Sequence, residues 1–157
     1  CIPGKLSAII RGVMNMKGSK DLLSSILKTT QAGQTGIRSI MNRPLNENLK
    51  TALHSQLREY NAIEKQAYDL ARERNWVLEE LDPTMKHISN MMSKTRLRFG
   101  DIDSKAASMM VTGNTRGIIK GYKNLNQYNN SDAAVGALAR KLLDCEKENI
   151  QQMQGFL

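Results

Sequence analysis

The sequence predicts an all-α protein whose helices pack as an antiparallel four-helix bundle. Aromatic residues make up only 4% of the 157 residues, and there are nine Met and three Pro. A β-sandwich or barrel needs more aromatic and β-branched positions and more turns. Four long stretches instead repeat apolar residues at spacings of three and four, as amphipathic helices do. The length fits one domain, with residues 1–18 as an N-terminal extension and residues 19–157 as the bundle.

The first helix is predicted over residues 20–42. Ser19 is suited to cap its first turn, because a serine oxygen can accept a hydrogen bond from a free backbone N–H. Pro44 ends it, since proline lacks an amide hydrogen and keeps the preceding residue out of helical geometry. The apolar stripe of this helix consists of Leu22, Leu23, Ile26, Leu27, Ile37, Ile40 and Met41. Before it, residues 1–18 are interpreted either as a short helix or as non-native sequence ahead of a start at Met14 or Met16.

The second helix is predicted over residues 45–75, with an extension through Leu81 left open. Asp82-Pro83 then signals a new start, with Asp as the N-cap and Pro at the first helical position. A short amphipathic insert is expected over residues 84–99, ending at Gly100. It is a candidate interaction surface, with an apolar side of Met85, Ile88, Met91 and Met92 and a basic side of Lys94, Arg96 and Arg98.

Two further helices are predicted over residues 103–128 and 133–153. In the first of them Gly113, Gly117 and Gly121 repeat every four residues and form a ridge without side chains. Each glycine costs about 1 kcal/mol relative to alanine inside a helix. Three aligned glycines therefore predict either the close approach of a neighbouring helix or a kink. The second follows a turn at residues 129–132, which ends with residues suited to N-capping.

The links between these helices are short, except for the insert between the second and third. Short links place successive helices antiparallel, and one long crossover in the middle is the topology of ferritin-like bundles. The sequence also resembles small bacterial ferritin-like proteins of unknown function, some of them related to spore coats. The resemblance covers residues 20–157 and rests on the segments LLSSILKTTQAGQTGIRSIM, LKTALHSQLREYNAIEKQAYDLARERNW and ALARKLLDCEKENIQQMQGFL. It implies a ferritin-like fold.

A ferritin-like fold raises the question of a metal centre. Metal-binding bundles of this kind use a Glu from each of two helices and Glu-x-x-His from each of the others. Neither of the two histidines here follows a Glu at that spacing, and the nearest matches are Gln56-x-x-Glu59 and Glu146-x-x-Asn149. We therefore expect no metal and no cofactor. If a metal is held after all, the candidate ligands are Glu59, Glu146 and Glu148.

The sequence also lacks the common catalytic motifs. There is no Walker phosphate loop, no GxSxG nucleophile elbow, and only two His to serve the many Ser and Thr. The carboxylate pairs Asp101/Asp103 and Glu146/Glu148 are each two residues apart, a spacing that places them on different faces of a helix. We therefore expect a protein that is not an enzyme.

The formal net charge of +8 lies in two blocks. Residues 1–50 carry eight basic and two acidic groups, and so do residues 83–123. Such a chain suits anionic partners, although a solvated basic face is the simpler interpretation because no run of adjacent Lys/Arg occurs. The two cysteines, Cys1 and Cys145, form no metal-binding motif and fit a reducing cytoplasm. No apolar run approaches the roughly 18 residues of a membrane-spanning helix.

Three functional hypotheses remain. The favoured one is a metal-free, non-catalytic ferritin-like bundle in the cytoplasm or a spore, acting as a structural or protein-interaction module and self-associating as a homodimer or larger assembly. The second is a basic module that binds nucleic acid or an anionic membrane through the 84–99 insert and the first helix. Loss of Lys94, Arg96 and Arg98 would then abolish salt-sensitive binding. The third is a divergent ferritin-like metal protein. Candidates for an internal polar network in the favoured case are Gln34, Asn114 and Asn149, because buried amides must be hydrogen-bonded.

Overall fold

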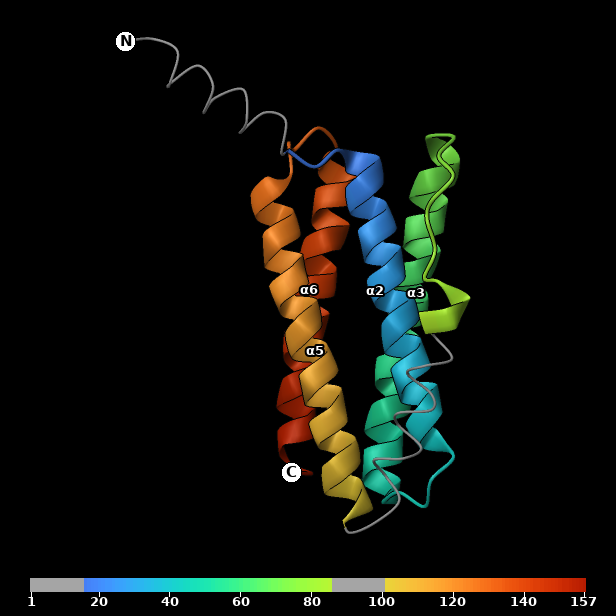
Figure 1. Ribbon diagram of the computed structural model, residues 1–157, viewed down its shortest axis with the longest axis vertical. Coiled ribbons are helices and arrows are strands. Elements are labelled where there is room, and N and C mark those ends of the chain that lie inside the picture. Colours follow the sequence, from blue (N-terminus) through green and yellow to red (C-terminus); the bar gives the residue numbers. More distant parts are fainter. Residues whose placement is uncertain (1–15, 86–100) are drawn as a thin grey trace, which may run out of the picture.

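The computed structural model describes residues 16–85 and 101–157, which form four long helices packed side by side (Figure 1). Helix α2 spans Ser19–Met41, α3 Glu47–Glu73, α5 Ile102–Gln127 and α6 Ala133–Gln154. The pairs α2/α3 and α5/α6 are each antiparallel, and between them the chain crosses from one end of the bundle to the other (Figure 1). The predicted antiparallel bundle with one long crossover is therefore confirmed. None of the described helices is long and apolar enough to cross a lipid bilayer.

One helix end differs from the prediction, and at a second the structure decides between two predicted ends. Gly18, not Ser19, is the N-cap of α2 and provides no side-chain cap. Ser19 is instead the first helical residue, and its Oγ hydrogen-bonds to the Tyr128 hydroxyl at 2.8 Å. Helix α3 does not continue to Leu81, because Asn75 adopts a left-handed backbone with φ 55°. Asparagine tolerates this conformation, so the helix can end there.

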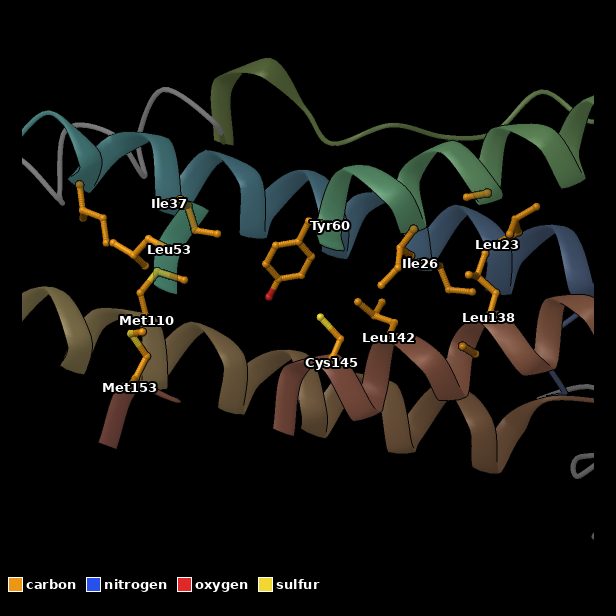
Figure 2. Packing of buried hydrophobic residues seen from close by; sticks show 14 of the residues in the cluster. Leu23, Ile26, Ile37, Leu53, Tyr60, Met110, Leu138, Leu142, Cys145 and Met153 are labelled. Carbon is orange, nitrogen blue, oxygen red and sulfur yellow. The ribbon is translucent and has the colours of Figure 1, made fainter. Parts of the chain in front are cut away.

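The hydrophobic core runs along the axis between the helices (Figure 2). Periodic residues of all four helices are buried, as the spacing of apolar residues predicts. The core residues with no measurable exposure are Leu23, Leu27, Ile37, Leu49, Leu53, Ala67, Ala106, Ala107, Val135 and Met153. This continuous core fixes how each helix is rotated about its own axis, and that rotation decides which polar side chains face inward.

The segment after α3 lies against α2. The Glu79 backbone N–H donates to Ser24 Oγ at 3.1 Å, and the Leu81 N–H donates to Gln31 Oε1 at 2.8 Å. Residues 83–85 are helical, and the Asp82 side chain accepts a hydrogen bond from the Thr84 N–H at 2.7 Å. The predicted insert therefore begins at Asp82-Pro83. Of its candidate interaction residues, Met85 is 56% exposed, while Ile88, Met91, Met92, Lys94, Arg96 and Arg98 lie outside the described residues.

The glycine ridge of α5 brings α6 close at two of its three positions. A Cβ at Gly117 would lie 2.9 Å from the Glu146 carboxyl group, and one at Gly121 would lie 3.2 Å from Leu143 Cδ1. A Cβ at Gly113 would meet nothing within 4 Å. Gly117 and Gly121 therefore serve the close approach of α6, and Gly117 makes room for the Glu146 side chain inside the bundle.

Candidate functional site: a buried polar cluster at the bundle centre

Tyr60 of α3 lies at the centre of the bundle. It is 1% exposed, and its ring points from α3 across the core toward α5 and α6 (Figure 2). The ring occupies space that Gly33 of α2 leaves free, since a Cβ at position 33 would lie 2.6 Å from the ring atoms. A side chain at position 33 and the observed ring position therefore exclude each other.

The Tyr60 hydroxyl joins two amides from the opposite helix pair. It donates to Asn114 Oδ1 of α5 at 3.0 Å and accepts from Asn149 Nδ2 of α6 at 3.3 Å. Both amides are buried, at 2% and 1% exposure. Burial, together with the nearby Glu146, raises the pKa of Tyr60 well above its usual value. The phenol therefore keeps the proton that it donates to Asn114.

Glu146 of α6 is a carboxyl group inside this cluster. It is 3% exposed, lies beside the Tyr60 hydroxyl and faces Gly117. Desolvation raises its pKa from 4.5 to about 8, against a smaller opposing effect of the nearby Tyr60 hydroxyl. Glu146 is thus protonated at neutral pH. Its Oε2 and Asn114 Nδ2 have no hydrogen-bond partner among the described residues.

The cluster is continued along α3 by Gln56, whose Nε2 donates to Gln152 Oε1 at 2.9 Å. Gln56 is 1% exposed, and its Oε1 has no partner within the described part of the chain. Gln56 and Tyr60 are four residues apart and share the inner face of α3. The polar centre is therefore composed of neutral groups: two amides, a phenol, a carboxylic acid and the adjacent Gln56 amide.

The structure separates the candidate metal ligands. Glu59 and Glu148 are exposed and line an outer groove between α3 and α6, whereas Glu146 faces inward. Cys145 lines the same outer groove and donates its thiol proton to Glu59 Oε2 at 3.2 Å. Burial raises the pKa of the Cys145 thiol, so the sulfur stays protonated. Within residues 16–85 and 101–157, no three His, Cys, Asp or Glu side chains come together as a metal site.

Two of the three predicted candidates for the polar network meet in the structure, and the third does not. Asn114 and Asn149 meet at the Tyr60 hydroxyl, whereas Gln34, which is buried at 4% exposure, donates to Glu64 of α3. Tyr60 is not among the network candidates predicted from the sequence, although its hydroxyl is the group at which the two asparagines meet. The spacing Glu146-x-x-Asn149 is the sequence signal that indicates the position of the cluster, because both of these side chains face it. The Gln56-x-x-Glu59 spacing misleads, since only Gln56 is inside.

Replacing Tyr60 by Phe should destabilise the fold by about 2 kcal/mol, because buried Asn114 Oδ1 would lose its partner and Asn149 Nδ2 would keep only the weak acceptor Cys145 Sγ. Urea unfolding monitored by circular dichroism measures this change. Tyr122→Phe is the matched control, since Tyr122 is 46% exposed, and it should change the stability by less than about 0.5 kcal/mol. Equal effects of the two variants would contradict a stabilising role of the Tyr60 hydroxyl.

Two solved structures resemble this bundle. A DUF305 fragment from Deinococcus radiodurans superposes with a TM-score of 0.70 at 11% sequence identity, covering 87% of this chain and 93% of that chain. A dodecameric thioferritin, the bacterioferritin-related protein from Bacteroides fragilis, gives a TM-score of 0.63 at 14% identity, covering 96% and 92%. No family model matches the sequence, and a search of the curated proteins gives no match. At these identities the likeness shows a ferritin-like fold, and the relation to spore coats stays a prediction.

Proposed function

We propose that this ferritin-like bundle is a metal-free, non-catalytic structural or protein-interaction module. The observation that supports the proposal most directly is the composition of the bundle centre. Tyr60 fills it, Asn114 and Asn149 bind its hydroxyl, and burial raises the pKa of Glu146 to about 8, which favours its protonated form. These groups satisfy part of one another's hydrogen-bonding capacity and hold the helices in register.

The same residues do not fit a di-metal centre. Two divalent ions need several anionic carboxylates and neutral imidazoles on facing helices. Glu146 is the only fully buried carboxyl group among the described residues, and a metal would have to displace its proton before binding. Where a Glu-x-x-His pair would place an imidazole, α6 carries the Asn149 amide, a weaker ligand.

Self-association is the second part of the proposal. The Bacteroides fragilis neighbour is dodecameric, which indicates that a bundle of this shape can assemble. Helix α5 presents Ile119 and Tyr122 with 50% and 46% exposure, and Met85 is also exposed. Ile119 and Tyr122 are three residues apart and share one face of the helix, so contact of this face with another chain would bury both side chains.

The test combines elemental analysis and light scattering on protein expressed with iron, zinc and manganese supplied. We expect only traces of metal and a mass that is at least twice the 17.6 kDa of one chain. Glu146→Gln should leave both results unchanged. Near-stoichiometric metal would overturn the metal-free proposal in favour of the divergent metal protein, and its disappearance in Glu146→Gln would place Glu146 among the ligands. A 17.6 kDa monomer would overturn self-association alone.

A further inference from the structure

A basic cleft lies on the side of the bundle formed by α2 and α5. These two helices together carry seven Lys/Arg and two Asp. Helices α3 and α6 together carry seven Lys/Arg and eight Asp/Glu. The excess positive charge of the described helices is therefore concentrated on α2 and α5. There a cleft of about 230 Å³ is lined by Lys17, Lys28 and Lys120.

Lys17 is held in place by its backbone and by its side chain. Its N–H donates to the Gln127 carbonyl at 2.6 Å, and its carbonyl accepts from the Asn129 N–H at 3.2 Å. Its Nζ donates to Asn124 Oδ1 at 2.7 Å. An ammonium group has three donors, so two N–H groups of Lys17 have no partner among the described residues.

Lys120 of α5 has no acidic or hydrogen-bonded partner among the described residues, whereas Lys28 is paired with Glu79 at 2.7 Å. Partial desolvation and the like charges of Lys17 and Lys28 lower the pKa of Lys120. An anionic ligand beside Lys120 would offset the repulsion among these lysines.

Two serines add buried donors to the cleft wall. Ser24 Oγ accepts from the Glu79 N–H at 3.1 Å, and Ser25 Oγ accepts from Asn124 Nδ2 at 2.7 Å. Both serines are buried and line the cleft. Other α2 hydroxyls, such as that of Thr30, donate to a carbonyl of their own helix. No described carbonyl takes the proton of Ser24 or Ser25, so both protons are free for a ligand.

The acidic groups of the cleft limit which ligand it suits. Glu79 is neutralised by Lys28, and Asp21 is the other carboxylate in the wall. We propose that this cleft binds a phosphate-class oxyanion, with the ammonium groups of Lys17 and Lys120 and the hydroxyls of Ser24 and Ser25 as donors. The two ammonium groups attract a dianion more strongly than they attract a monoanion. The ligand is inorganic phosphate or the phosphoryl group of a small metabolite.

Calorimetric titration of the full chain with inorganic phosphate at constant ionic strength tests this proposal. We expect saturable binding that Lys120→Gln weakens by about tenfold or more, as loss of one charge-assisted hydrogen bond implies. Lys123→Gln on the same helix is the matched control, because Lys123 is exposed and does not line the cleft. It removes the same charge and should weaken binding by less than about twofold.

A parallel titration with phosphoserine distinguishes the two sources of the anion. Tighter binding of phosphoserine would support a metabolite phosphoryl group, and tighter binding of inorganic phosphate would support the free ion. The proposal is overturned if neither binds, if chloride gives the same heat, or if the two lysine variants weaken binding equally. Unchanged melting temperatures of both variants show that the fold is intact. None of these results depends on metal content or assembly, so they test the anion site independently of the proposed function.

Discussion

Glu146→Gln should stabilise the protein at pH 7 by up to about 3 kcal/mol. The native carboxyl group has a pKa of about 8, against an ordinary value of 4.5. Unfolding at pH 7 therefore releases a proton and gains the solvation of a carboxylate, a gain of about 1.4 kcal/mol for each pH unit between 4.5 and 7. Glutamine has the shape of the protonated acid and no such gain. Urea unfolding of the two proteins at pH 7 measures the difference.

The pH dependence of the free energy of unfolding provides a second test of the raised pKa of Glu146. Because the native pKa of Glu146 is raised, its stabilising contribution is fully present below pH 4.5 and is lost as the pH rises toward 8. Wild type should lose stability over this window, and Glu146→Gln should lose correspondingly less. Glu148→Gln on the same helix is the control, since Glu148 is exposed, and it should change stability by less than about 0.5 kcal/mol. A destabilised Glu146→Gln with an unchanged pH profile would mean that Glu146 is ionised in the native state.

Gly33→Ala should destabilise the fold by about 2 kcal/mol, although alanine is the better helix former. The new Cβ would lie 2.6 Å from the Tyr60 ring, and the ring cannot move without losing Asn114 and Asn149. Overpacking of a buried site costs about 1–3 kcal/mol, more than the 1 kcal/mol or less that helix propensity returns. Thermal or urea unfolding measures the loss.

Gly36→Ala is the matched control for this substitution. Gly36 lies in the same helix, and a Cβ there would meet nothing within 4 Å. It should therefore stabilise the protein by up to about 1 kcal/mol. In a Tyr60→Ala background the clash is gone, and Gly33→Ala should become neutral or stabilising, as expected for directly coupled sites. Similar effects of Gly33→Ala and Gly36→Ala in wild type would contradict the close contact between Gly33 and Tyr60.

Much of the fold was predictable because its signals are local. The three-and-four spacing of Leu22, Ile26 and their equivalents determines which face of each helix is buried, and Pro44 acts on its immediate neighbours. The end of α3 depends on signals that are not local. Asn75 can occupy either a helical or a left-handed backbone, and the ion pair between Arg74 and Asp132 joins residues 58 positions apart.

The sequence by itself therefore determined the helices, the crossover, the positive charge and the poor match to a metal-ligand set. Only the tertiary structure decided that Tyr60 reaches Asn114 and Asn149, that Glu146 is desolvated opposite Gly117, and that Lys17, Lys120 and two serines of α2 share one cleft. The physical reason is that helix formation depends on residues three and four apart. These contacts instead depend on the rotation and spacing of whole helices, which the packing of the entire core sets.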